Sequence, residues 1–261
     1  MHAEQPDAWT GLRSYTAARI ALGRAGHSLP TGELLRFQLA HAQARDAVYS
    51  ELDAAQLAGE VMALGIGAIA LQSRAGNRAE YVRRPDYGRQ LHPESRERLS
   101  EHAPGGAPPD LCFVLADGLS ARAVQSHAVP LLAAVLPGLA AAGWTLSPVA
   151  LVRGGRVAVG DEIGHALGAR IVAVLIGERP GLSAPDSLGV YLTYGPRPGL
   201  TDESRNCISN VRPEGLPPAA AAGPLLYLLH EMRSRKLSGV GLKDERLPAP
   251  ATPPGLVPPV G

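Results

Sequence analysis

Four short apolar runs, separated by segments of helical character, constrain the fold more than any other feature of this sequence. The runs are LCFVLA (111–116), PVALV (148–152), RIVAVLI (170–176) and LGVYLTY (188–194). Such runs are typical of strands that are buried on both faces of a sheet. Helical segments at about 119–142 and 161–168 lie between the first three runs, and a last helix is expected at about 219–235. The alternation predicts an α/β fold with a mostly parallel, doubly wound (Rossmann-like) sheet.

A helical N-terminal region is predicted to precede this sheet. Between Thr31 and about Gly65, apolar residues recur at helical spacing without proline, which indicates one or two helices with Thr31 as the N-cap. The loop EHAPGGAPPD, rich in Gly and Pro, ends this half of the chain. We therefore expect a helical region over residues 1–105, an α/β domain over 106–243 and a Pro-rich, disordered tail over 244–261.

The balance of charges excludes a general attraction to polyanions. Lys and Arg total 25 and Asp and Glu total 24, which gives a net charge of +1. Arginines gather at 74–98, but acidic residues are interleaved with them, as on a solvated or protein-facing surface. Cys112 and Cys207 form no CxxC motif, so we expect neither a disulfide scaffold nor a Cys-rich zinc site. We expect no nucleic-acid partner and an intracellular location.

No membrane partner is expected either. Residues 123–152 carry no Asp, Glu, Lys or Arg, but Pro130 and Pro137 interrupt the stretch, and it falls short of the ~20 uninterrupted apolar residues of a span. A buried helix followed by a buried strand accounts for it. The amino terminus contains acidic residues and no apolar core, so it does not have the pattern of a secretory signal.

The motifs yield no catalytic set. Gly155 and Gly160 have P-loop spacing, but Asp161 and Glu162 follow where Lys and Ser or Thr are needed, so phosphate would be repelled there. A hydrolase triad around Asp117 fails too. Its Ser and His candidates, at 120 and 127, are seven residues apart on one predicted helix, ~10 Å along the axis.

One histidine comes close to a metal-ligand signature. His165 and Gly168 have the spacing of the last positions of the D-x-H-x-x-G motif, by which one class of cobalamin proteins supplies a histidine to cobalt. Ile163 occupies the Asp position, so the carboxylate that would orient the imidazole is missing. We expect His165 to be a helix-surface residue, and we expect no metal ligand in this chain.

The remaining polar segments lie at presumed strand ends, where ligands of open α/β sheets bind. The segments that leave the first three strands are 117–118, 153–157 and 177–179. Two stretches dense in polar residues, 176–199 and 205–216, complete the set. Their charged and amide side chains are expected to bond to one another, to the backbone or to a ligand, and the residues alone leave that choice open.

Several segments together resemble the small (light) subunit of ethanolamine ammonia-lyase. They are AARIALGRAGHSLPTGELLRFQLAHAQARDAVY, LADGLSARAVQSHAVPLL, GRVAVGDEIGHALGARIVAVLIGERPGLSAPDSLGVYLTYGPRPG, RNCISNVRPEGL and LSGVGLK. The segments cover most of residues 17–243, and the combination of GERPGL with RNCISN is the most specific part of the resemblance.

The resemblance implies a lyase that uses adenosylcobalamin to convert ethanolamine to acetaldehyde and ammonia. It implies that a large subunit holds the substrate and the radical chemistry. It also implies that the N-terminal region of the small subunit contacts the large subunit, and that the α/β domain of the small subunit completes the cobalamin site at the interface. The family's cobalamin contacts fall on Val157, Glu178 and Cys207, and no catalytic residue falls on this chain. The family binds cobalamin base-on, with the cofactor's own dimethylbenzimidazole on cobalt, in agreement with the broken histidine motif.

Two expectations complete the interpretation. About sixteen residues precede the matching AARIALGRAG, whereas relatives destined for bacterial microcompartments carry a longer N-terminal extension, so a dispersed cytoplasmic location is expected over encapsulation. The alternative function is a non-catalytic nucleotide-binding or interaction module with the same fold. Agreement at positions 157, 178 and 207 favours the lyase subunit.

Overall fold

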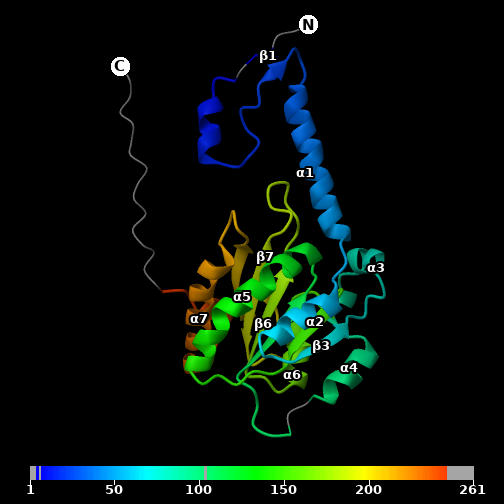
Figure 1. The fold of residues 1–261 in the computed structure, drawn as a ribbon, viewed down its shortest axis with the longest axis vertical. Helices are drawn as coiled ribbons and strands as arrows, with labels where there is room; N and C mark the ends of the chain where they lie inside the picture. Colours follow the sequence, from blue (N-terminus) through cyan, green and yellow to red (C-terminus); the bar gives the residue numbers. More distant parts are fainter. Residues whose placement is uncertain (1–3, 6, 103–104, 246–261) are drawn as a thin grey trace.

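The computed structural model describes residues 4–5, 7–102 and 105–245 (Figure 1). A sheet flanked by helices forms the body of the protein, and an arm from the N-terminal part of the chain extends away from it. Most of the expected Pro-rich tail, residues 246–261, lies outside the described residues.

The body is built on a six-stranded mixed sheet with the order β3-β5-β4-β6-β7-β8. The strands are β3 (Ala68–Gln72), β4 (Leu111–Ala116), β5 (Val149–Arg153), β6 (Ile171–Gly177), β7 (Leu188–Tyr194) and β8 (Arg205–Val211). β3, β5, β4 and β6 pair in parallel, whereas β7 returns antiparallel to β6, and β8 pairs antiparallel with β7. The α/β class and the mostly parallel sheet are confirmed. The doubly wound (Rossmann-like) arrangement is not confirmed, because a loop rather than a helix joins β6 to β7.

The four expected strands form within one residue of their expected bounds, and two further strands join them at the edges. Only three of the seven residues of β8 are buried, so this strand lacks a continuous apolar run. β3 is short, and only Ile69 and Leu71 in it are buried. It comes from the segment before the loop 101–110, so the sheet draws strands from both sides of that loop.

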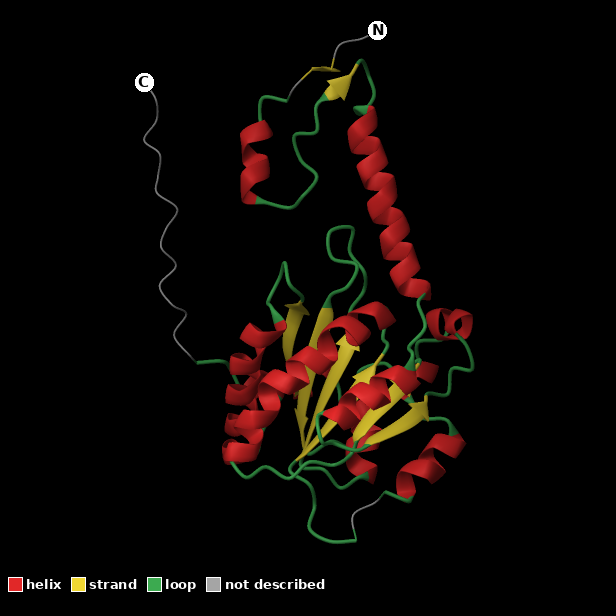
Figure 2. Ribbon diagram, in the orientation of Figure 1, coloured by secondary structure: helices red, strands yellow, loops and turns green. Residues whose placement is uncertain are grey.

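Helices cover both faces of the sheet (Figure 2). On one face lie α2 (Ala54–Ala63), α5 (Ala121–Ala141) and α7 (Pro218–Arg235). On the other lie α4 (Pro93–Ser100) and α6 (Val159–Ala166). Alternate residues of β4 enter the two cores, Phe113 on the first face and Val114 on the second. Every residue of β4 and β6 is buried, which explains why their sequences are uniformly apolar.

Helix α5 continues without a break through Pro130 and Pro137, so the expectation that these residues interrupt the stretch was wrong. It is the one helix among the described residues that is long and apolar enough to cross a bilayer. Its apolar side packs against α7 and the sheet, with Val124, Leu131 and Leu132 fully buried. A buried helix followed by the buried strand β5 is therefore confirmed.

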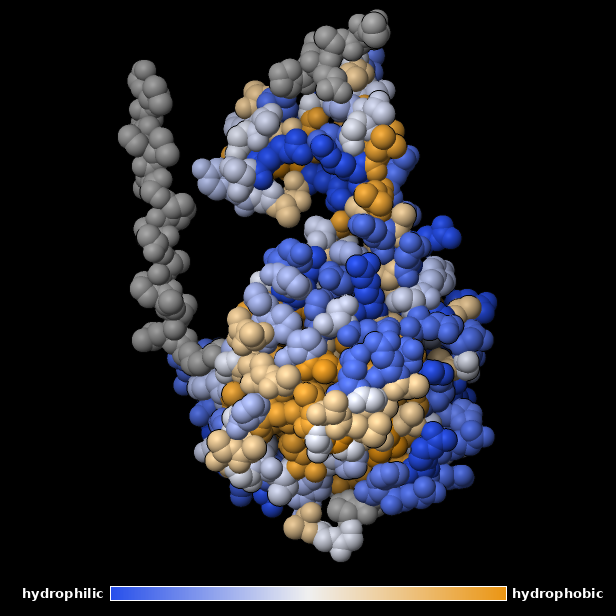
Figure 3. Space-filling model, in the orientation of Figure 1, coloured by the Kyte–Doolittle hydropathy of each residue, from blue (hydrophilic) through white to orange (hydrophobic). Residues whose placement is uncertain are grey.

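The N-terminal arm contains helix α1 (Thr31–Tyr49), a short 3-10 helix (Thr10–Tyr15) and the strand pair β1 (Glu4–Gln5) and β2 (Arg24–Ala25). α1 begins at Thr31 with Pro30 as its N-cap, so the expected capping role of Thr31 was wrong. Only Ala40 and Ala47 of α1 are buried. Figure 3 shows apolar atoms on the surface of this helix. The large hydrophobic side chains exposed on it are Leu34, Leu35, Phe37, Leu39 and Tyr49.

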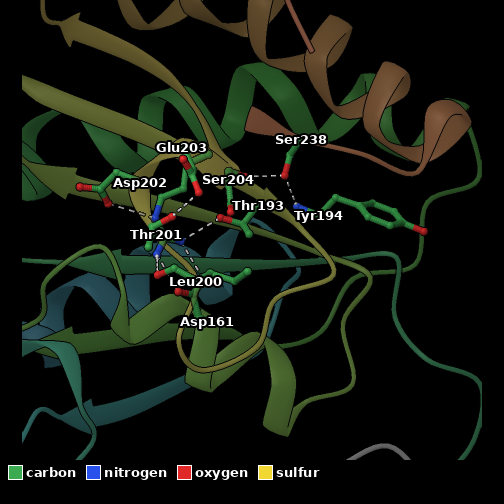
Figure 4. A network of polar contacts seen from close by, with 10 residues as sticks. Asp161, Thr193, Tyr194, Leu200, Thr201, Asp202, Glu203, Ser204 and Ser238 are labelled. Atoms are coloured by element: carbon green, nitrogen blue, oxygen red, sulfur yellow. Dashed lines mark hydrogen bonds and ion pairs between the residues drawn. The ribbon is translucent and has the colours of Figure 1, made fainter. Parts of the chain in front are cut away.

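A buried ion pair joins α6 to the β7–β8 edge of the sheet (Figure 4). The Nη1 and Nη2 atoms of Arg205 donate to the two carboxylate oxygens of Asp161 at 2.7 Å each, and both side chains are 2% exposed. Nη1 also donates to Thr193 Oγ1 at 3.0 Å. Asp161, which would repel a phosphate in a P-loop, is here the structural partner of an arginine.

Breaking this pair from one side should destabilise the fold. Arg205→Met leaves the Asp161 carboxylate buried without its cation, which costs ~3 to 5 kcal/mol of unfolding free energy. Urea unfolding measures the loss. Adding Asp161→Leu to the same chain should recover much of the stability, because a buried ion pair can be replaced by apolar side chains at little cost.

The exposed pair Arg84–Asp86 provides the control, and Asp86→Asn should leave the unfolding midpoint almost unchanged. An equally small effect of Arg205→Met would contradict the structural importance of the buried pair.

Candidate functional site

The site forms where the chain switches direction across the sheet. From β4 the chain passes through α5, on one face of the sheet, to the neighbouring strand β5. From β5 it passes through α6, on the other face, to β6, which lies on the far side of β4. The crevice at the carboxyl ends of β4, β5 and β6 is therefore a topological switch point, the usual ligand position in open α/β sheets. The three segments expected at this edge, 117–118, 153–157 and 177–179, do meet there.

Asp117 joins the ends of β4 and β5. Its two carboxylate oxygens accept hydrogen bonds from the backbone N–H groups of Gly154 at 3.0 Å and Gly155 at 3.1 Å. Burial raises the pKa of this carboxyl, and these two bonds and the charge of Arg78 oppose that shift. The next residue, Gly118, has a φ of +55°, and a Cβ on it would collide with the carbonyl oxygen of Gly177. The two strand ends can approach this closely only with glycine here.

Helix α3 (Arg78–Arg83) lies over this junction. Arg78 Nη1 donates to the carbonyl oxygen of Gly118 at 2.7 Å and lies 3.7 Å from the Asp117 carboxylate. The buried Tyr81 donates its hydroxyl to the carbonyl oxygen of Gly155 at 3.2 Å. Burial raises the pKa of the Tyr81 hydroxyl well above its usual range, so it remains protonated. α3 thereby fixes the loop that follows β5.

A cavity of about 400 Å³ opens at this edge. Val157, from the loop after β5, and Glu178, directly after β6, both line it, together with Arg156, Arg179 and Tyr191. The structure thus brings together two of the three residues expected to contact cobalamin.

Glu178 is anchored on one oxygen only. Its Oε2 accepts hydrogen bonds from the Ser187 hydroxyl and, at 3.2 Å, from the backbone N–H of Asn210. Among the described residues no donor reaches Oε1. Arg205 pairs with Asp161 and not with Glu178. The second oxygen of this half-buried carboxylate can therefore accept a hydrogen bond from a ligand.

Cys207 lies beside this cavity rather than in its lining. On β8 it pairs in register with Tyr191 of β7. Loss of hydration on the side packed against the sheet raises the pKa of the Cys207 thiol, and the nearby Glu178 charge adds to the shift. The thiol is therefore protonated at neutral pH, exposed and close to Glu178.

The loop between β6 and β7 is fastened at its far end. Asp186 accepts hydrogen bonds from Arg212 Nε at 3.0 Å and from His127 Nε2 at 3.2 Å. Burial alone would raise the pKa of the Asp186 carboxyl. The hydrogen bond from His127 and the charge of Arg212 outweigh that effect and hold this pKa below its usual range. The Ser120 hydroxyl donates to the carbonyl oxygen of Pro185 at 3.0 Å. Ser120 and His127 thus hold the same loop and form no triad.

No metal centre is present in the described part of the chain: no three His, Cys, Asp or Glu residues gather there. His165 is exposed on α6, as expected for a surface residue. The residues that sequence reasoning missed are Tyr81, Arg156 and Tyr191. Arg156 fell within a segment singled out at the strand ends, whereas no local signal marks either tyrosine.

Comparison with known proteins identifies the family of this chain. Residues 6–243 match the family model described as ethanolamine ammonia-lyase light chain (EutC). The chain is 59% identical over 238 residues to a protein of Azotobacter vinelandii, covering 91% of this chain and 88% of the relative. It is 59% identical to a protein of Ralstonia nicotianae (90% and 88% covered) and 56% identical to one of Pseudomonas putida (91% and 88% covered). All three relatives are named ethanolamine ammonia-lyase small subunit. The chain belongs to the ethanolamine ammonia-lyase light chain family.

Proposed function

We propose that this chain is the small subunit of an adenosylcobalamin-dependent ethanolamine ammonia-lyase, which converts ethanolamine to acetaldehyde and ammonia. In this proposal it completes the cobalamin site at its interface with a large catalytic subunit. One observation carries the proposal: in a member of this family, Val157 and Glu178 line one cavity at the sheet edge, and Cys207 lies beside it through Tyr191.

The residues at the cavity fit a cobalamin. Glu178 Oε1 is an acceptor for the amide N–H groups around a corrin ring, and Val157 offers apolar contact. Arg156 also lines the cavity and forms no ion pair among the described residues, so its guanidinium can donate to a ligand. A cavity of about 400 Å³ is much smaller than a whole cobalamin. Another surface must cover the rest of the cofactor, and we assign that role to the large subunit.

The N-terminal region, over residues 1–105, is proposed to contact the large subunit. Its arm leaves Leu35, Leu39 and other large apolar side chains exposed on α1, and clustered exposed apolar residues are typical of protein interaction surfaces. The arm extends away from the sheet (Figure 1), so a partner can reach it.

We propose a division of labour in which the large subunit holds the substrate. The cofactor supplies radical chemistry when bound, and this chain's residues bind it, orient it and exclude water from one side. We assign no catalytic acid, base or nucleophile to this chain. We expect the cofactor to be bound base-on, because Ile163 replaces the carboxylate that would orient His165, and we place the enzyme in the cytoplasm, with no membrane or nucleic-acid partner.

The competing candidate is a non-catalytic nucleotide-binding or interaction module. The switch-point crevice alone would suit it. The approach of residues 157, 178 and 207 to one another favours the cobalamin subunit. Visible absorbance of cobalamin that co-purifies with this chain and a large subunit tests the choice, and a colourless complex after incubation with cobalamin would reject our proposal.

The isolated chain should have no lyase activity. With ethanolamine and adenosylcobalamin, it is expected to release no acetaldehyde, whereas its complex with the large subunit does, because the catalytic groups lie on the partner. An alcohol dehydrogenase assay that follows NADH oxidation measures acetaldehyde, with the large subunit alone as the control. Turnover by the purified small subunit would overturn the proposal.

No histidine of this chain should bind cobalt. The complex is prepared with ¹⁵N-histidine in the small subunit, and the cob(II)alamin electron paramagnetic resonance spectrum is recorded. The nitrogen splitting should match that of the unlabelled complex, because the cofactor's own base occupies the lower position. A splitting that changes with the isotope would show that a histidine has displaced that base.

Glu178 should contribute most to cofactor affinity among the three contacts. Glu178→Ala removes an acceptor and should weaken cobalamin binding roughly 5- to 150-fold, from ~1 to 3 kcal/mol for a lost buried hydrogen bond. Cys207→Ala and Val157→Ala should each cost less, because they lose a weak thiol donor and packing. Equilibrium cobalamin titration of each mutant complex gives the ranking.

Thermal melting separates lost contact from lost folding, because Glu178 also fastens Ser187 and Asn210. Glu178→Gln keeps an acceptor oxygen and should bind more tightly than the Ala variant. If Glu178→Ala binds as the wild type does while Cys207→Ala does not, the carboxylate is structural and the ranking is wrong.

A further inference from the structure

Arg156 lies in the wall between two cavities at the carboxyl edge of the sheet. The cavity that contains Glu178 has a volume of about 400 Å³, and its neighbour, near Arg205, has about 340 Å³. Arg156 and Val157 line both. A ligand that contacts Val157 from either side therefore passes close to the Arg156 guanidinium.

The Arg156 guanidinium is held in place without a carboxylate. Its central carbon lies 4.4 Å from the centroid of the Tyr81 ring, and Tyr81 is fixed by the bond from its hydroxyl to Gly155. The Arg156 backbone N–H donates to the carbonyl oxygen of Gly88 at 2.7 Å. Stacking on an aromatic ring orients an arginine but leaves its charge unneutralised.

The charges around Arg156 leave a positive excess in this wall. Within the described ranges neither Arg156 nor Arg179 forms an ion pair, while the Arg205 guanidinium is paired with Asp161 and Asp202. The single carboxylate that lines the larger cavity, Glu178, already accepts two hydrogen bonds from this chain. A partly buried cation without a counter-charge is unfavourable unless a ligand supplies an anion.

We propose that Arg156 binds a phosphate group, the phosphodiester in the nucleotide tail of the bound cobalamin. This inference rests on the proposed function. The corrin amides are neutral, so the phosphodiester is the anionic group that the cofactor can offer to an unpaired arginine. Arginine presents a planar pair of donors that matches two phosphate oxygens. The position next to Val157 would place the nucleotide tail along the loop after β5.

The test compares two corrinoids on the complex with the large subunit. Cobalamin carries the phosphodiester, whereas cobinamide lacks the phosphate, the ribose and the base. Arg156→Gln should weaken cobalamin binding by about tenfold or more, as for a lost charge-assisted hydrogen bond, and leave cobinamide binding at the wild-type value. Arg156→Lys keeps the charge but loses the planar pair of donors, so it should bind cobalamin more tightly than Arg156→Gln and more weakly than the wild type. Absorbance titration after removal of free ligand measures each dissociation constant.

Arg233→Gln is the matched control. Arg233 stacks on Trp144 at 4.5 Å from the ring centroid, and it lines a cavity with Ile171 and Tyr194 at the amino end of β6. Its loss removes the same charge from an aromatic stack at the opposite edge of the sheet and should leave both titrations unchanged. Melting temperatures verify that all variants are folded.

Each other outcome has a distinct meaning. If the wild-type complex binds neither corrinoid, the proposed function fails. If it binds both and Arg156→Gln weakens both equally, Arg156 shapes the site or contacts the corrin, and the phosphate assignment is overturned. If Arg156→Gln changes neither titration, the arginine faces the partner or solvent, and the inference is wrong.

Inorganic phosphate should compete with cobalamin and not with cobinamide. Phosphate that binds without displacing cobalamin would indicate a separate anion site and overturn the assignment.

Discussion

The buried carboxylate of Asp117 is the interaction on which the candidate site depends. It accepts hydrogen bonds from the backbone N–H groups of Gly154 and Gly155 and thereby links the end of β4 to the loop after β5. A buried carboxylate is unfavourable unless donors surround it, so this loop has little freedom to move. Arg156 and Val157 follow directly in the chain, and their positions are consequences of that constraint. Tyr81 fastens the same loop from α3 through Gly155.

The second wall of the cavity is fixed by contacts made at a distance from it. Glu178 begins the loop between β6 and β7, and Asp186, near the other end of that loop, is held by His127 and Arg212. The backbone of β8 contributes through Asn210, which donates to Glu178. Both antiparallel strands therefore help to position a residue at the end of a parallel one. This explains why a mixed sheet, rather than a purely parallel one, serves the site.

The sequence predicted the parts of this arrangement that depend on continuous burial. β4 and β6 are buried along their whole length, so their apolar runs gave nearly correct bounds, and the approach of Val157 to Glu178 followed from the topology of strand ends. β8 was missed because only three of its seven residues are buried, so Cys207 entered only through the family resemblance. Tyr81 and the pair of His127 with Asp186 could not be predicted, because each depends on contacts between segments more than fifty residues apart.

The exposed apolar side of α1 has a consequence for how the protein is produced. Side chains such as Leu35 and Leu39 stay in water as long as nothing covers the arm, and surfaces of this kind self-associate and attract chaperones and proteases. Copies of the chain made in excess of whatever covers α1 would aggregate or be degraded. A cell that uses this protein gains from matching its synthesis to that of the covering surface, so that translation rates, and not affinity alone, determine how much of it accumulates.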